Sequence, residues 1–182
     1  MKTKDLILIA LFAALITVGA YIRVPVPVCP FTLQFLFTTL AGLLLGSRKG
    51  AVSVAVYVLM GLVGLPVFTG GGGIGYVLQP TFGYLLGFIL GTFVTGHIAH
   101  KGELTLPRLL WAGFAGLLVV YAMGMAYYWA ICRFWLNDPI GIVPLFLYCF
   151  VLAVPGDICL CMLSAVLGKR LVPVVKQTFK IA

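Results

Sequence analysis

Charged side chains are scarce in this sequence. They make up 9% of its 182 residues, whereas hydrophobic residues make up 63%. A soluble domain carries about a quarter charged residues, so the composition excludes a soluble globular domain and indicates an integral membrane protein. The length is that of a single domain, residues 1–182. The first apolar run is long and no small-residue cleavage site follows it, so we expect a membrane span there and not a cleaved signal peptide.

Acidic residues and catalytic motifs are rarer still. The chain has four acidic residues, too few to form a carboxylate cluster for Mg²⁺. It contains no Walker A loop, no HExxH, no GxSxG and no glycine-rich dinucleotide motif. We therefore expect no enzyme activity and no ATP hydrolysis by this chain, so an ATP-driven step needs a partner.

Cysteine and histidine do not fall at the spacings of metal ligands. The five cysteines follow no metal pattern, and a metal pair at His97 and His100 would need further ligands. We expect the cysteines to be small buried residues and the histidines to lie in a solvated loop. We expect the chain to hold no metal and no cofactor.

Six apolar segments predict an all-α membrane protein with six transmembrane helices. The second to fourth segments are short for isolated spans of about 20 residues, but short helices are tolerated when they are tilted or surrounded by other helices. The predicted spans are Leu6–Tyr21, Phe31–Gly46, Ala51–Leu65, Thr81–Gly96, Leu109–Ile131 and Pro144–Leu167.

The basic residues divide unevenly between the two sides of a six-span chain. The termini and even-numbered loops hold ten of the 12 Lys and Arg residues, and the odd-numbered loops hold only Arg23 and Arg133. Because cytoplasmic loops carry the excess of basic residues, we expect both termini in the cytoplasm. The net charge of +8 suggests nucleic acid at first sight, but its distribution fits membrane orientation better, so we expect no nucleic-acid partner.

Asp157 is the one carboxylate inside a long apolar segment, Pro144–Leu167. In a spanning helix it lies roughly 15 Å from either end, at about 1.5 Å per residue. A carboxylate at that depth costs at least about 2.5 kcal/mol, and such groups usually face a polar cavity or a partner. Pro155 and Gly156 precede it and loosen the helix, which is tolerated where backbone lines a cavity. The sequence therefore predicts a polar site inside the membrane domain.

Two loops on the predicted outer side are unusual in composition. The segment Arg23–Pro30, RVPVPVCP, alternates prolines and is expected to be a stiff, extended strap. The segment Pro66–Gln79, PVFTGGGGIGYVLQ, contains four consecutive glycines, which let a backbone approach a ligand closely. We expect the two loops to form a lid over a pocket open to the outside. A flexible connector is the alternative for the glycine-rich loop.

Small residues recur at four-residue spacing in two of the predicted spans. Gly83, Gly87 and Gly91 form one ridge, and Ala10 and Ala14 form another. Such ridges let helices pack closely in lipid. We expect the glycine ridge to pack within this protein, whereas the alanine pair fits either internal packing or a partner helix.

Three motifs, taken in their order along the chain, resemble the BioY family. They are VPVPVCPFTLQ after the first span, GLPVFTGGGGIGYVLQPTFGYLLGF across the second outer loop, and VPGD at Asp157. The resemblance covers nearly the whole chain. BioY proteins are the biotin-binding S components of energy-coupling factor (ECF) transporters, so the resemblance implies the six-helix ECF S-component fold and high-affinity capture of biotin from outside.

The resemblance also implies partners. They are a transmembrane coupling subunit and two ATP-binding cassette (ABC) ATPase subunits, and Ala10 and Ala14 match the AxxxA motif that docks to the coupling subunit. Two positions depart from the family pattern. The motif PGDxxK carries a lysine where this chain has Leu160, and the glycine often found before PT is Gln79 here.

The chemistry of biotin assigns roles to residues around these motifs. Its ureido group has two N–H donors, for which the Asp157 carboxylate is the natural acceptor. Amide side chains suit the ureido oxygen, and aromatic side chains suit the ring. Arg23 and the backbone N–H groups of the glycine loop are rival partners for the valerate carboxylate. The candidate biotin-binding residues are Asp157, Gln79, Gln34, Tyr84, Tyr76, Phe68, Gly71, Gly72, Gly73 and Arg23.

Plainer roles for these residues stay open. Asp157 also fits a helix–helix hydrogen bond, Gln34 a helix cap or interfacial residue, and Tyr84 packing or a membrane-boundary position. At the level of function, the alternative is a solitary or proton-coupled small-molecule carrier in which Asp157 binds and releases a proton. A membrane enzyme would need a nucleophile–base pair or a metal cluster, and the sequence shows neither.

Overall fold

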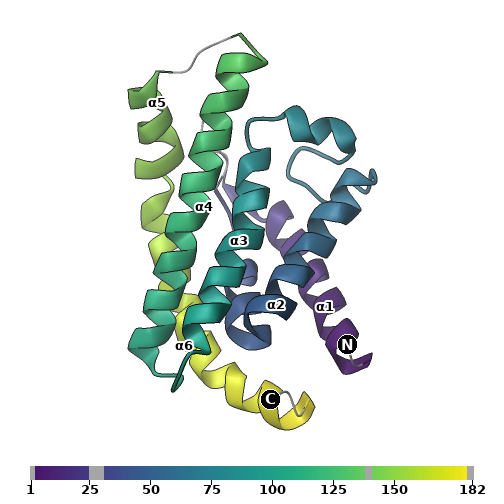
Figure 1. Ribbon diagram of the computed structural model, residues 1–182, viewed down its shortest axis with the longest axis vertical. Helices are drawn as coiled ribbons and strands as arrows, with labels where there is room; N and C mark the ends of the chain where they lie inside the picture. Colours follow the sequence, from purple (N-terminus) through teal and green to yellow (C-terminus); the bar gives the residue numbers. More distant parts are fainter. Residues whose placement is uncertain (1–2, 25–30, 138–140, 180–182) are drawn as a thin grey trace.

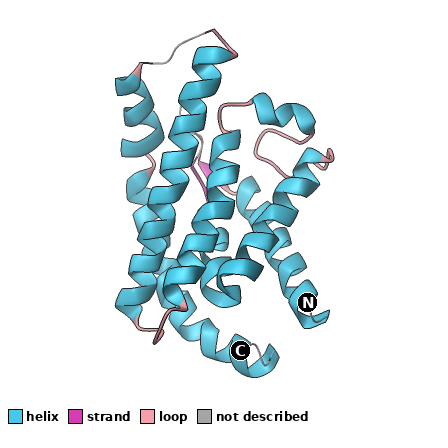
Figure 2. Cartoon of the chain, in the orientation of Figure 1, coloured by secondary structure: helices cyan, strands magenta, loops and turns pink. Residues whose placement is uncertain are grey.

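The described residues fold into a bundle of helices with one short pair of strands (Figures 1 and 2). The computed structural model describes residues 3–24, 31–137 and 141–179. The helices are α1 (Thr3–Tyr21), α2 (Gln34–Leu62), α3 (Phe82–Ala99), α4 (Leu106–Phe134), α5 (Ile142–Phe146) and α6 (Val154–Phe179). A 3₁₀ turn, η1, covers Ile74–Leu78, and a π-helical segment, η2, covers Leu147–Val151. The strands are β1 (Arg23–Val24) and β2 (Phe31–Thr32).

Helix α2 contains both of the predicted spans 31–46 and 51–65. It is broken at Gly46, whose backbone has φ +81° and ψ 179°. A Cβ atom placed on Gly50 would lie 2.8 Å from the carbonyl oxygen of Ala41. Nine residues of a straight helix extend about 13.5 Å, so this contact requires the chain to reverse at Gly46. The expected loop between the two spans is therefore replaced by a break at one residue.

Five helical stretches in the described part of the chain are long and apolar enough to cross a membrane, with α2 counted as one. Because α2 turns back on itself, its two arms supply two of the six predicted passages. The last stretch runs from Val143 to Val175, through α5, η2 and α6. The predicted helical membrane fold is confirmed, and one difference lies in how the second and third spans are joined.

The last predicted span, 144–167, is not one regular helix. The N–H group of Leu152 donates to the oxygen of Leu147, five residues back, at 3.2 Å, and α6 starts at Val154. Pro155 has no N–H group, which is tolerated in the first turn of a helix. Asp157 therefore lies in the first turn of α6. The sequence predicted a loosened helix before Asp157, and the structure places the irregularity one turn earlier.

The glycine ridge packs α3 tightly against α4. Cβ atoms placed on Gly83 and Gly87 would lie 2.2 Å from Tyr127 and 2.9 Å from Val120, closer than real Cβ atoms approach. The predicted internal packing of this ridge is confirmed. Ala10 and Ala14, in contrast, are exposed on α1.

The start of α1 and the end of α6 lie at the same end of the bundle (Figure 1). There the Lys49 ammonium group lies 2.7 Å from a carboxylate oxygen of Asp5, which ties α1 to the second arm of α2. Beyond the end of α1, β1 and β2 pair antiparallel, with Arg23 opposite Thr32. Residues 25–30 of the predicted proline strap lie outside the described residues.

We predict that Gly46→Ala destabilises the protein. The backbone at Gly46 lies in a region that is almost restricted to glycine, where another residue costs about 1–3 kcal/mol. A Cβ atom there would meet only the His100 ring, at 4.0 Å, so the penalty comes from the backbone and not from a clash. Thermal unfolding in detergent should show a lower midpoint.

Gly75→Ala is the matched control, because a Cβ atom there meets nothing within 4 Å and the residue has no positive φ. Equal midpoints for the wild-type protein and Gly46→Ala would contradict the assignment of the α2 reversal to this backbone conformation.

Candidate functional site

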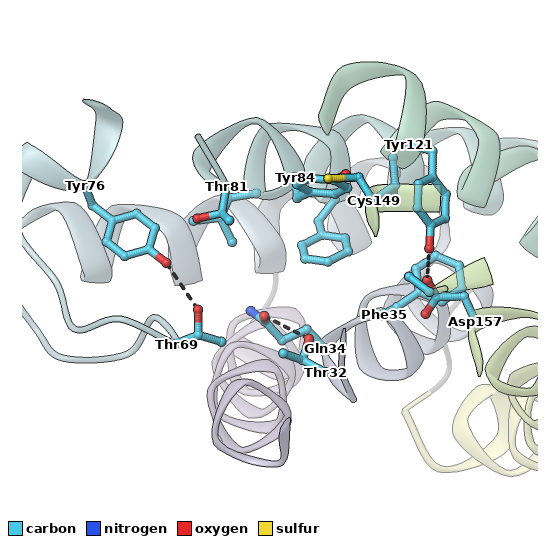
Figure 3. A pocket seen from close by; sticks show the side chains of 14 residues that line it. Thr32, Gln34, Phe35, Thr69, Tyr76, Thr81, Tyr84, Tyr121, Cys149 and Asp157 are labelled. Carbon is cyan, nitrogen blue, oxygen red and sulfur yellow. Dashed lines mark hydrogen bonds between the residues drawn. The ribbon is translucent and has the colours of Figure 1, made fainter. Parts of the chain in front are cut away.

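A cavity lies among α2, α3, α4, η2 and α6, beneath the loop that joins α2 to α3 (Figure 3). Its lining combines polar side chains with an apolar wall. The lining residues are Thr32, Gln34, Phe35, Thr69, Tyr76, Thr81, Tyr84, Leu85, Phe88, Val120, Tyr121, Cys149, Ala153 and Asp157. Four of the predicted site residues, from four separate parts of the chain, thus meet in one cavity: Gln34, Tyr76, Tyr84 and Asp157.

Asp157 stands at one end of this cavity. Its Oδ2 atom accepts a hydrogen bond from the hydroxyl group of Tyr121, at 2.5 Å. Tyr121 comes from the middle of α4, and Asp157 from the first turn of α6. A carboxylate away from bulk water needs such donors, because the protein must replace its hydration.

Gln34 is buried at the first residue of α2 and is fixed by a chain of hydrogen bonds. Its Nε2 atom donates to the hydroxyl group of Tyr57 at 2.8 Å, and its Oε1 atom accepts from Thr32 at 3.1 Å. The Tyr57 hydroxyl group donates in turn to the carbonyl oxygen of Val67, at 3.1 Å. The amide therefore has a set orientation, and it retains one N–H group beyond the one that Tyr57 receives.

Tyr76 and Tyr84 line the cavity, whereas Phe68 is not among its lining residues. Phe68 is buried between Tyr57 and Tyr76, with ring centroids 5.6 Å and 4.5 Å away. Phe68 therefore packs against the ring of Tyr76 without lining the cavity itself. The Tyr76 hydroxyl group also lies 3.2 Å from Oγ1 of Thr69.

The glycine-rich loop is an ordered turn. Phe68 and Gly71 exchange two backbone hydrogen bonds, and the N–H group of Gly73 donates to the oxygen of Gly61 at 2.7 Å. Gly71 and Gly73 both have positive φ, which explains glycine at these positions. Two of the N–H groups expected to bind an anion are therefore committed within the protein. Gly71, Gly72 and Gly73 lie outside the lining of the cavity.

Side chains from α1 and β1 hold this loop in place. The Nη1 atom of Arg23 donates to the oxygen of Thr69 at 2.7 Å, and the hydroxyl group of Tyr21 donates to the oxygen of Pro66. Arg23 is exposed beside Thr69, which lines the cavity. Gln79 is exposed and does not line the cavity. Its backbone joins η1 to the start of α3.

Sequence reasoning missed several polar residues of the lining, of which Tyr121 is the most informative. A signal was present, because tyrosines of membrane proteins are enriched at the ends of spans and not in their middles. A tyrosine in the middle of the predicted span 109–131 needs a partner for its hydroxyl group. The three threonines of the lining, Thr32, Thr69 and Thr81, carry no comparable signal.

The comparisons with known proteins agree on one family. The sequence model of the BioY family matches residues 1–177. A protein of Lysinibacillus sphaericus, named probable biotin transporter BioY, is 47% identical over 177 residues, which cover 97% of this chain and 90% of that protein. The biotin transporter BioY of Thermotoga maritima is 43% identical over 147 residues, 78% of this chain and 84% of its own.

A solved structure has the same fold. It is the crystal structure of the S-component for biotin from an ECF-type ABC transporter, with a TM-score of 0.79, 26% sequence identity and coverage of 94% of both chains. Together with the five apolar helical stretches, these likenesses identify a multi-pass membrane protein.

Proposed function

Because the chain belongs to the BioY family, we propose that it is the biotin-binding membrane subunit of a vitamin uptake transporter. Biotin is its transported ligand and not a cofactor, and the protein is not an enzyme. The observation that carries this proposal is the cavity, where a carboxylate, an amide and aromatic side chains converge inside a membrane-spanning bundle. Small-molecule sites have this composition, with apolar walls and a few placed polar groups.

The polar groups of the cavity suit the ureido end of biotin at Asp157. Tyr121 occupies Oδ2, so Oδ1 is available to accept a ureido N–H group in a charge-assisted bond. Gln34 is the better candidate for the ureido oxygen than Gln79, because its amide lines the cavity and Gln79 is exposed. Tyr84 supplies an aromatic wall beside the ring.

The other end of the cavity suits the valerate tail. Figure 3 shows Tyr76 and Thr69 together at the end opposite Tyr121 and Asp157. Arg23 reaches this end through its hydrogen bond to the oxygen of Thr69, and the remaining N–H groups of its guanidinium are suited to a carboxylate. We assign the valerate carboxylate to Arg23 at the rim and not to the glycine loop, whose N–H groups at Gly71 and Gly73 are already used.

We predict that Asp157→Ala lowers biotin affinity about a hundredfold. The loss of a charge-assisted hydrogen bond costs roughly 1.5–3 kcal/mol, and an unpaired ligand N–H group adds to that. Asp157→Asn should do less damage because its amide oxygen still accepts one bond. Calorimetry on the purified protein in detergent measures both, and desthiobiotin, which keeps the ureido group, should lose affinity in parallel.

Arg23→Gln is the companion variant for the other end of the ligand. It should weaken binding of biotin more than binding of biotin amide, which has no carboxylate.

Wild-type affinity in a folded Asp157→Ala protein would contradict a role for the Asp157 carboxylate in binding biotin. Asp157 would then serve only as a hydrogen-bond partner between helices. That result would also leave open a proton-coupled carrier.

We propose further that the protein works with an energy-coupling module of a transmembrane coupling subunit and two ABC ATPase subunits. The exposed pair Ala10 and Ala14 supports this, because it forms a small-residue ridge on a lipid-facing surface of α1. Its neighbours Ile7 and Leu11 are large and exposed. A partner helix can approach closely only where the side chains are small, and the alanines provide that place.

Ala14→Trp should abolish biotin uptake by cells that carry the coupling module, while biotin binding by the isolated chain changes little. A ring at position 14 holds apart two helices that need close contact. Leu118→Trp, on an exposed position of α4, is the matched control and should leave uptake unchanged. Uptake by this chain without any coupling module would instead favour the solitary carrier.

We propose that both termini are cytoplasmic and that the cavity opens outward. The ten basic residues of the termini and even-numbered loops support this orientation. In a protein freed of its native cysteines, a membrane-impermeant thiol reagent applied to intact cells should label Ile74→Cys on η1 and not Arg48→Cys beside the α2 reversal. Both positions are exposed. Labelling of Arg48→Cys without labelling of Ile74→Cys would show the opposite orientation in the membrane.

A further inference from the structure

Among the described residues of α6, no side chain donates a hydrogen bond to Asp157. The residues that share its helix face one turn later are Leu160 and Cys161, and both are buried in the apolar core. The ion pair that the described residues form joins Lys49 to Asp5, at the end of the bundle where the termini lie. The side chain that donates to Asp157 comes instead from α4, and it is Tyr121.

The ring of Tyr121 is held firmly enough to aim its hydroxyl group. It is 4% exposed and meets Tyr84 and Phe150 edge to face, with centroids 6.2 Å and 5.2 Å away. Tyr121 lines both the cavity and an apolar groove between α4 and the η2–α6 segment. The ring thus packs against apolar neighbours, while the hydroxyl group alone reaches the carboxylate (Figure 3).

Asp157 needs such a restraint because of its place in the chain. The regular helix is interrupted at Leu152 and Ala153, between η2 and α6, so the first turn of α6 is not the continuation of a rigid helix. The hydrogen bond from Tyr121 spans 36 positions of sequence and joins this turn to the middle of α4.

We infer that Tyr121 is a positioning residue of the biotin site, whose hydroxyl group holds Oδ2 of Asp157 and turns Oδ1 toward the ligand. This inference rests on the proposed function for its ligand, but the hold itself does not depend on biotin. Tyr121 acts through Asp157, so its contribution to affinity should largely disappear when the carboxylate is removed.

The test is Tyr121→Phe, which keeps the ring and its packing and removes only the hydroxyl group. We expect biotin affinity to fall about tenfold in the wild-type background. In the Asp157→Asn background the same change should cost about threefold or less, because neutral hydrogen bonds are about half as strong as charge-assisted ones. Tyr127→Phe is the matched control. Tyr127 is on the same helix, and its hydroxyl group donates to the oxygen of Val77 at 2.5 Å. Neither residue lines the cavity.

Infrared difference spectroscopy supplies a readout without biotin. The spectrum of the wild-type protein minus that of Asp157→Asn isolates the Asp157 carboxyl band. The band should move when the same difference is recorded in the Tyr121→Phe background, and it should stay in place in the Tyr127→Phe background. An unmoved band, or a tenfold affinity loss in both the wild-type and the Asp157→Asn backgrounds, would overturn the inference. If the band moves in the Tyr121→Phe background but the wild-type protein binds no biotin, the proposed ligand is overturned. The hydrogen bond that holds Asp157 would still stand.

Discussion

A carboxyl group away from bulk water must be solvated by the protein, and this requirement shapes the centre of the molecule. The hydrogen bond from Tyr121 to Asp157 meets it with a neutral donor. It requires α4 to pass close to the start of α6, which leaves a cavity between them and α3. The glycine ridge of α3 lets α4 pack directly against α3, since Gly87 lies against the backbone of Val120. One polar contact and one run of small residues therefore position the cavity wall.

The same requirement explains how the loop between α2 and α3, which contributes to the cavity lining, is held in place. Irregular backbone at the end of a membrane bundle leaves carbonyl groups that need donors. In the loop after α2, the oxygens of Pro66, Val67 and Thr69 accept hydrogen bonds from the side chains of Tyr21, Tyr57 and Arg23, respectively. These donors come from α1, α2 and β1. A loop rich in glycine is thus held from three directions, which is why it forms a defined surface and not a flexible connector.

Much of this could be predicted from the sequence, because hydropathy and charge are local signals. Long apolar runs located the helices, and the lone carboxylate Asp157 located the cavity. A reversal between the second and third spans was predicted, but its form was not, since nothing in the sequence shows that a single residue, Gly46, breaks an otherwise continuous helix. Tyr121 was missed because its role depends on an element 36 residues away. Gln79 was expected near the ligand for its amide, but proximity along the chain does not decide which way a side chain faces.

The proposed ligand site and the proposed docking ridge occupy separate parts of the molecule, and this separation follows from how α1 is used. One side of α1 is buried, with Phe12 and Ile16 in the core, and the other side presents Ala10 and Ala14 outward. At the end of α1, the hydroxyl group of Tyr21 donates to the oxygen of Pro66 in the loop between α2 and α3, and at its start Asp5 forms an ion pair with Lys49 of α2. A partner helix bound at Ala10 and Ala14 would therefore contact the same helix that holds the loop between α2 and α3 through Tyr21. The proposed ligand site and the proposed docking ridge share no side chain, but α1 links them through its hydrogen bond to Pro66, and rigid helices are among the elements that carry coupling between sites.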